Sequence, residues 1–161
     1  MITQANITKK LAWLLCLTSG LSVFSPVNAK QVATPTMPSQ LIGVWYPDNA
    51  DGHERCQNMK KKKHMEGNIA LALEITQSGY NQRAEYGEGN FMTPYRTEKN
   101  AKKVWTTYAN VTLDGSDEIE GKDVSRFALK NSKITLTELS YVSPRVTQYF
   151  KCMGKLPAFS S

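Results

Sequence analysis

The chain has 161 residues, of which 40% are hydrophobic and 21% charged, and its formal net charge at pH 7 is +6. This length leaves room for one compact domain once the leader described below is removed, and it excludes two. The basic excess is mild, so the charge alone does not indicate a nucleic-acid-binding protein.

The first 29 residues have the pattern of a secretory signal peptide. Lys9 and Lys10 form a basic start, residues 11–24 form an apolar segment too short to span a bilayer comfortably, and residues 27–29 form a small-residue cleavage site. Removal of both lysines lowers the net charge from +6 to +4. No second apolar segment of membrane length follows, so we expect a periplasmic or secreted protein without a transmembrane segment.

The chain has three cysteines, and the first, Cys16, lies in the segment that export would remove. The remaining pair, Cys56 and Cys152, belongs to no CxxC motif or other pattern typical of a metal site. In an oxidising compartment such a pair predicts a disulfide. The bridge would close a loop of about 97 residues, for which the chain-entropy model gives roughly 4–5 kcal/mol of stabilisation.

Residues 30–40 contain Pro35 and Pro38 without hydrophobic periodicity, which is typical of an extended leader. We expect a single β domain over residues 41–156 and a C-terminal tail at residues 157–161. Segment 53–65 is the one candidate for a helical turn in this domain, and it is polar enough to form a loop instead.

The rest of the domain consists of short segments with strand periodicity, separated by turns rich in Gly, Asn, Ser and Pro. Apolar side chains alternate with other residues most clearly in 69–75 and 105–113. The segments 127–129 and 134–136, joined by a short polar turn, predict a hairpin. Seven or eight short strands predict an all-β fold, either a small closed antiparallel barrel or a β-sandwich. The expected strands are 41–46, 69–75, 80–86, 105–113, 124–129, 133–139 and 145–152.

The first predicted strand carries a short motif of a known family. Gly43 and Trp45 match the G-x-W element of lipocalin-like β-barrels, and the segment 149–152 resembles their closing strand. The resemblance implies that Trp45 packs at the closed end of a barrel. It also implies that a basic residue of the last strand, Arg145 or Lys151, lies over the indole ring, a contact worth about 0.5–2 kcal/mol. An ordinary buried aromatic residue is the alternative interpretation of Trp45.

A barrel of this kind suggests a binding protein that holds a small apolar or amphipathic ligand in its interior. Small barrels can instead be filled by their own side chains. The aromatic residues that we expect to line such an interior are Tyr80, Tyr86, Trp105, Tyr108 and Phe127.

Four consecutive lysines, Lys60, Lys61, Lys62 and Lys63, form the most concentrated charge in the chain. Like charges repel and stay solvated, so we expect an exposed loop between the first two strands. The run suggests either a solvated loop without a dedicated partner or contact with an anionic surface, such as lipid head groups or an acidic envelope protein. The alternative function is therefore a periplasmic protein-binding module. No aromatic residues accompany the lysines, so we expect no nucleic-acid partner.

Motifs for catalysis and metal binding are weak. The acidic stretch 114–123 fails the calcium-loop template because Ile119 occupies the position of the invariant glycine. A second group of polar residues, 48–54, suits an Asx-rich turn better than a ligand set. After export the chain retains two histidines and has no nucleophile motif. We therefore expect no metal, no cofactor and no enzymatic activity.

Overall fold

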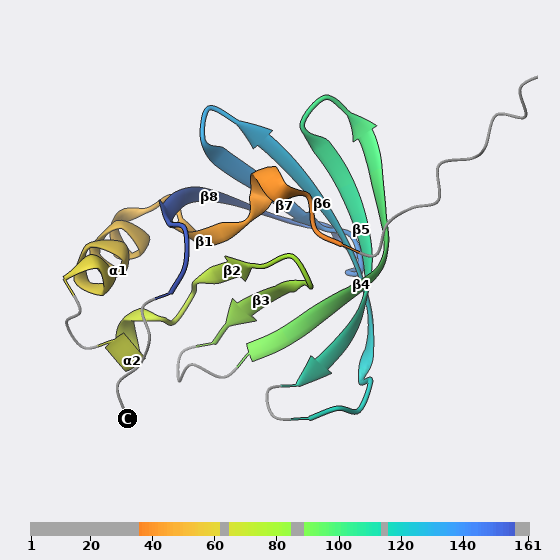
Figure 1. Cartoon of the computed structure of the whole chain (residues 1–161), viewed down its shortest axis with the longest axis horizontal. Helices are drawn as coiled ribbons and strands as arrows, with labels where there is room; N and C mark the ends of the chain where they lie inside the picture. The colour runs from red at the N-terminus through yellow and green to blue at the C-terminus, as the bar shows by residue number, and fades with distance from the viewer. Residues whose placement is uncertain (1–35, 62–64, 85–88, 114–115, 157–161) are drawn as a thin grey trace, which may run out of the picture. The chain divides into compact units, whose positions relative to one another are not determined.

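The computed structural model describes residues 36–61, 65–84, 89–113 and 116–156, all within one compact unit that spans residues 31–161. Eight antiparallel strands pair in sequence order, and the last closes on the first to form a barrel (Figure 1). The barrel prediction is confirmed and the sandwich alternative is wrong. The strands are β1 (Gly43–Pro47), β2 (Leu73–Ile75), β3 (Tyr80–Arg83), β4 (Gly89–Ala101), β5 (Val104–Leu113), β6 (Gly121–Lys130), β7 (Lys133–Glu138) and β8 (Arg145–Met153).

The barrel interior follows the period of two predicted for its strands. Cross-strand partners such as Trp45 and Leu73, or Phe127 and Leu136, place their side chains on the same inner face. These residues belong to one continuous apolar core. Its buried members are Met37, Leu41, Trp45, Leu73, Ile75, Tyr80, Met92, Trp105, Ala109, Phe127, Ile134, Leu136 and Tyr149.

The hairpin predicted around residues 130–133 is confirmed as β6 and β7. Lys130 pairs with Lys133, and the two residues between them, Asn131 and Ser132, have φ angles of 49° and 59°. Two consecutive positive φ angles are characteristic of the tight type I′ turn, whose twist matches that of the flanking strands. Asn131 and Ser132 adopt this positive-φ backbone, and the turn that they form sets the register between β6 and β7.

Strand β4 was not predicted, although it is the longest in the barrel. Only Met92 and Pro94 among its 13 residues are buried, so its inward side carries too little apolar character for an alternating pattern to be visible. Its pairing with β3 ends at Met92, and a bulge follows Pro94 in the pairing with β5. The proline thus stands where the strand has a partner on one side only, which is the position that tolerates a missing N–H.

Of the two interpretations of segment 53–65, the helical one is confirmed and the loop is wrong, because most of this segment lies in helix α1 (Ala50–Lys60) and in the short helix α2 (Met65–Asn68). Asn49 is the N-cap residue of α1, and its side-chain oxygen accepts a hydrogen bond from the Gly52 backbone N–H at 2.8 Å. Asp51 in its first turn and Lys60 in its last suit the helix dipole. Neither helix in the described ranges has the length and apolar composition needed to cross a bilayer.

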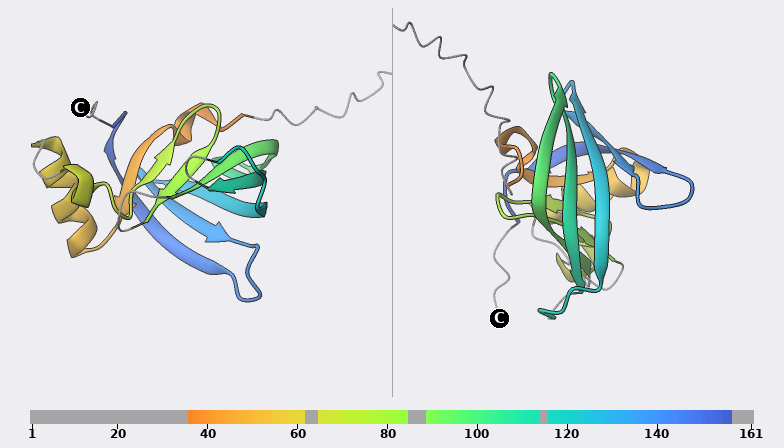
Figure 2. Two further views of the ribbon diagram at one scale, coloured as in Figure 1. Left: turned by 90° about the horizontal axis from the view of Figure 1, so that it is seen from below. Right: turned by 90° about the vertical axis from the view of Figure 1, so that its right-hand side faces the viewer.

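A second, smaller core explains why a polar segment forms this helix. The buried residues of α1 are Gly52, Cys56 and Met59, and their spacing of four and three residues places them on one helix face. This face packs on the outer side of β1 and β8 (Figure 2). The predicted disulfide joins Cys56 of α1 to Cys152 of β8 within this core, with 5.7 Å between the Cα atoms. The other buried members are Val44, Tyr46, Ile69 and Ala72.

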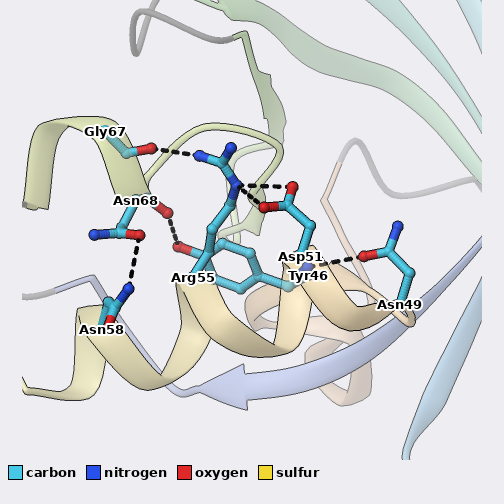
Figure 3. Close-up of polar contacts among 8 residues, drawn as sticks. Tyr46, Asn49, Asp51, Arg55, Asn58, Gly67 and Asn68 are labelled. Atoms are coloured by element: carbon cyan, nitrogen blue, oxygen red, sulfur yellow. Dashed lines mark hydrogen bonds and ion pairs between the residues drawn. The ribbon is translucent and has the colours of Figure 1, made fainter.

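Polar contacts hold α1 and α2 together on the outside of the barrel (Figure 3). Arg55 forms an ion pair with Asp51 at 2.9 Å and donates a hydrogen bond to the backbone oxygen of Gly67 at 2.6 Å. The Tyr46 hydroxyl of β1 donates to the backbone oxygen of Asn68 at 2.7 Å. Burial raises the pKa of Tyr46 to about 12, so its hydroxyl remains a donor at neutral pH. The helical layer is therefore fixed to β1 as well as to β8.

Some expected segments lie outside the described ranges. These are the signal peptide at 1–29, most of the leader at 30–40 and the tail at 157–161. Met37, which the sequence assigns to the leader, is buried in the barrel core, and its backbone N–H donates to the Gln77 oxygen at 3.0 Å.

Candidate functional site

One end of the barrel is closed by the chain segment that precedes β1. The 3-10 helix η1 (Ser39–Leu41) places Leu41 in the core, and its backbone oxygen accepts a hydrogen bond from the Trp45 indole N–H at 2.8 Å. Met37 and Leu41 are both buried there. Apolar side chains therefore fill the barrel interior at this end.

Of the two basic residues expected over Trp45, the structure places Lys151 there and not Arg145. The Lys151 ammonium lies 5.3 Å from the ring centroid and donates to the Ile42 backbone oxygen at 2.9 Å. Arg145 lies instead over Tyr141, 3.9 Å from its ring centroid. The register explains the difference, because Lys151 pairs directly with Trp45, whereas Arg145 pairs with Glu138 at the other end of β8.

The five aromatic residues expected to line the interior differ in their positions. Phe127, Trp105 and Tyr80 are buried in the core, and Tyr80 meets Phe127 edge to face with 5.2 Å between the ring centroids. Tyr108 stands three residues after buried Trp105, so its side chain points to the opposite, outer side of β5. There the guanidinium carbon of Arg96 lies 4.3 Å from the Tyr108 ring centroid. The expectation that Tyr108 lines the interior is therefore wrong. Tyr86 lies outside the described residues.

The open end of the barrel contains a cavity of about 260 Å³. Its walls come from strands β3 to β7 and from the loop between β7 and β8. Met92 and Val111 contribute apolar surface beside the polar side chains of the wall, so the cavity is amphipathic. The remaining lining residues are Tyr80, Gln82, Asn90, Lys122, Asp123, Ser125, Glu138, Ser140 and Tyr141.

Three hydroxyl groups surround the carboxylate of Asp123. Its Oδ2 accepts hydrogen bonds from the Tyr80 hydroxyl at 2.5 Å and from Ser125 at 2.6 Å, and its Oδ1 accepts one from Ser140 at 2.9 Å. Ser140 also accepts a hydrogen bond from the Val124 backbone N–H at 2.6 Å, which holds the β7–β8 loop against β6. The carboxylate thus has a fixed orientation at the cavity wall.

Glu138 is the second carboxyl group of this cavity. Burial raises its pKa above the ordinary value, and the negative charge of Asp123 raises it further. A hydrogen bond from Gln82 and the positive charge of Arg145 act in the opposite direction. The net shift is upward, so Glu138 holds a proton more readily than a carboxyl group in water.

Two phenols near these carboxyl groups also have shifted pKa values. Burial and the neighbouring Asp123 raise the pKa of Tyr80 well above its ordinary value. Burial, with a smaller effect from Glu138, raises the pKa of Tyr149 to about 12. Both phenols therefore remain protonated at neutral pH, and Tyr80 can serve Asp123 as a hydrogen-bond donor.

Charge balance is the unusual property of this cavity. Across the described ranges, none of the ion pairs within 4.0 Å includes Asp123 or Glu138. Neutral donors orient Asp123 and Gln82 assists Glu138, but no cation neutralises either group at short range. Chemically, the cavity can accept a molecule with an apolar part and a hydrogen-bonding or cationic part.

Asp123 and Glu138 are not among the site residues predicted from the sequence. Asp123 stands in the acidic stretch that was tested only against a calcium loop. The available signal was strand periodicity, because Asp123, Ser125 and Phe127 alternate on one face of β6, and Ile134, Leu136 and Glu138 do so on β7. Alternation identified the inner face, but which end of the barrel remains open depends on the pairing of all eight strands.

The lysine run has a different setting from the one expected. Lys60 ends α1, and Lys61 is its exposed C-cap residue. Both side chains are exposed as expected, but they stand at the end of a helix and not in an extended loop. Lys62 and Lys63 lie outside the described residues.

Comparisons with known protein families, with curated proteins and with solved structures found no match to this chain.

Proposed function

We propose that this protein is an exported, non-enzymatic binding protein that holds a small amphipathic molecule at the open end of its barrel. The observation that carries the proposal is the cavity of about 260 Å³, which combines apolar and polar walls on a closed barrel. Ligand sites are typically concave and mostly preformed, with a few fixed polar groups that orient the ligand. Asp123, held by three hydroxyl groups, is such a group.

The location of the ligand follows from the packing of the interior. Trp45, Phe127 and Leu136 have 0–1% exposure and fill the barrel below the cavity. A cavity near the lower limit of about 300 Å³ for ligand sites suits a small molecule and not a long acyl chain. The ligand would therefore occupy the open end and stop above Phe127.

The likeness to lipocalin-like domains also supports this proposal. Gly43 and Trp45 stand at the start of β1, η1 closes the barrel below them, and Lys151 covers the indole ring. This combination is the arrangement that the G-x-W resemblance implies. We propose on this basis that the chain is a lipocalin-like binding protein.

A binding assay with a cavity-filling variant tests the proposal. Val111 contributes to the cavity wall, whereas Thr112, the next residue of β5, points to the outside. A small fluorescent amphipathic probe should bind the native protein, and Val111→Trp should weaken its affinity at least tenfold. Thr112→Trp is the matched control and should bind normally, with far-UV circular dichroism used to verify that both variants fold. Failure of a panel of such probes to bind, or equal affinity in both variants, would contradict the proposal.

Helix α1 supports a second candidate function, a periplasmic protein-binding module. The disulfide and the Arg55 contacts hold this helix rigidly, and its last turn presents exposed Lys60 and Lys61. A rigid basic helix end suits an acidic protein surface. Lys60→Gln with Lys61→Gln should reduce capture of an acidic envelope protein and weaken its salt dependence. Lys102→Gln with Lys103→Gln, in the β4–β5 turn, provides the control with the same charge change.

A further inference from the structure

We propose that the open end of the barrel selects small organic cations, with a protonated amine placed between Asp123 and Glu138. This inference rests on the proposed function, because it assigns a ligand class to the same cavity. Its basis is a pair of carboxyl groups in a concave site, neither of which takes part in an ion pair within the described part of the chain. An ammonium group would supply the missing positive charge together with hydrogen-bond donors.

The geometry places both carboxyl groups within reach of one head group. Glu138 stands directly opposite Ser125 in the β6–β7 register, and Asp123 lies two residues before Ser125. Such diagonal neighbours on one face of a sheet are about 7–8 Å apart, which leaves room for a small ammonium group between their side chains. Both side chains face the interior, because Ser125 and its neighbours Phe127 and Leu136 are buried there.

The hydrogen bonds to Asp123 leave it suited to a cation. A carboxylate has about four acceptor positions, and the hydroxyl groups of Tyr80, Ser125 and Ser140 use three of them. These donors are neutral, so they orient the carboxylate without cancelling its charge. One acceptor position remains for a donor on the ligand.

Glu138 links the binding of a cation to proton release. Its raised pKa has burial as the main cause, with the charge of Asp123 as a further one. A cation beside both groups favours the ionised form of Glu138 and opposes both effects. Ligand binding should therefore lower the Glu138 pKa and release protons at pH values near that pKa.

The positive side chains around the cavity are held away from the carboxyl pair. Arg145 is the cation that acts on Glu138, and it lies over Tyr141 at the rim without forming an ion pair. Lys122 alternates to the outer side of β6, where its ammonium lies 5.9 Å from the Tyr95 ring centroid. Tyr80 and Tyr149, the phenols near the pair, remain neutral. Two acidic groups therefore face the space that the ligand would occupy. Among the described residues, Lys122 in the cavity wall and Arg145 near Glu138 are the cations that oppose them, and neither forms an ion pair with either carboxyl group.

Three probes of the same chain length test the charge preference. We would titrate the full folded protein at pH 7 with hexylamine, hexanol and hexanoate and follow binding by calorimetry or by NMR chemical shifts. Hexylammonium should bind at least tenfold more tightly than hexanol, and hexanoate should bind most weakly. Equal affinity for all three would overturn the cation inference but leave a ligand site at the open end. Tightest binding of hexanoate would also overturn it and would identify Arg145 as the recognising group.

Near-isosteric variants separate this inference from the proposed function. Asp123→Asn and Glu138→Gln should each lower the affinity for hexylammonium at least fivefold and leave that for hexanol nearly unchanged. Glu98→Gln is the matched control, because Glu98 lies on the outer side of β4 in an ion pair with Arg96. Unchanged hexylammonium affinity in both cavity variants would overturn the inference. Failure of all three molecules to bind, or binding insensitive to Val111→Trp, would contradict the proposed function itself.

A measurement of proton release provides an independent readout. Calorimetry at several pH values above the ordinary carboxyl pKa of about 4.5, each in two buffers with different ionisation enthalpies, gives the number of protons released on binding. The native protein should release protons with hexylammonium, whereas Glu138→Gln should release markedly fewer. Equal release by both would overturn the role of Glu138 even if the affinities followed the expected order.

Discussion

The two ends of the barrel differ in chemistry although the same strands build both. At the closed end, the inward positions carry Trp45, Ile134 and Leu136, whose exposure is at most 1%. At the open end, the inward positions of β6 and β7 carry Asp123, Ser125 and Glu138. The closed end thus provides packing and the open end provides polar groups that neighbouring loops keep in place. The separation allows each end to be changed with little effect on the other.

The largest expected effect on stability is at the closed end. Phe127 is fully buried among apolar side chains, so Phe127→Ala should lower the free energy of unfolding by about 3–5 kcal/mol. Urea denaturation followed by tryptophan fluorescence would measure the loss. Tyr141→Ala at the open end, where the ring is 43% exposed, is the control and should change stability by about 0.5 kcal/mol or less. Similar losses in both variants would contradict the division between the two ends.

Removal of the disulfide should have the next largest effect. Replacing Cys56 and Cys152 together by serine should lower the free energy of unfolding by about 2–5 kcal/mol, because the bridge restricts the unfolded chain and fixes α1 to β8. Intact mass with and without reductant would first establish the bridge in the purified protein, through a difference of two hydrogens. Ligand affinity at the open end should persist in the variant under conditions where it remains folded. Loss of affinity in a folded variant would show that the helical layer also shapes the cavity.

The contact of Lys151 with Trp45 should contribute less. Lys151→Gln removes the charge over the indole ring and weakens the hydrogen bond to Ile42, so we expect a loss of about 0.5–2 kcal/mol in thermal or chemical unfolding. Arg145→Gln is the matched test of the open end. Its contact with Tyr141 is exposed, so its effect on stability should be smaller. The reverse order of effects would favour Arg145, the other candidate from the sequence, as the cation that supports the closed end.

The smallest expected effect on stability is the pH dependence caused by Glu138. Its folded-state pKa is raised, so its favourable contribution is complete below the ordinary pKa of about 4.5 and is lost as the pH rises through the folded-state pKa. Glu138→Gln removes this dependence. The native protein should therefore lose stability relative to the variant between pH 4 and pH 7, as measured by chemical unfolding at several pH values. A difference that grows in the opposite direction would contradict the raised pKa.

Local signals were sufficient for part of the fold. Asn131 and Ser132 suit a tight turn between two alternating segments, and the β6–β7 hairpin formed there. Helix α1 had comparable signals, namely the N-cap at Asn49 and buried positions at helical spacing, but its polarity concealed them. A helix that covers one patch of a barrel needs only a narrow apolar face, and here three residues and a disulfide provide it.

Other features depended on distant parts of the chain. Strand β4 has little apolar alternation, and its identity follows from the long pairing with β5. The choice between Lys151 and Arg145 depended on register, because Lys151 faces Trp45 across the β1–β8 closure. Neither the existence of β4 nor the cation over Trp45 can be predicted from the residues of a single segment, because each depends on the register with another strand.

The sequence by itself determined the all-β class, with a barrel or a sandwich as its architecture, and the pairing of Cys56 with Cys152, because strand periodicity and an isolated cysteine pair are local or countable properties. The tertiary structure alone decided which end of the barrel is filled, which cation covers Trp45, and where the acidic residues meet. Asp123 and Glu138 are 15 positions apart in the chain and belong to different strands. Their shared cavity exists because barrel closure brings these strands into register and leaves one end open.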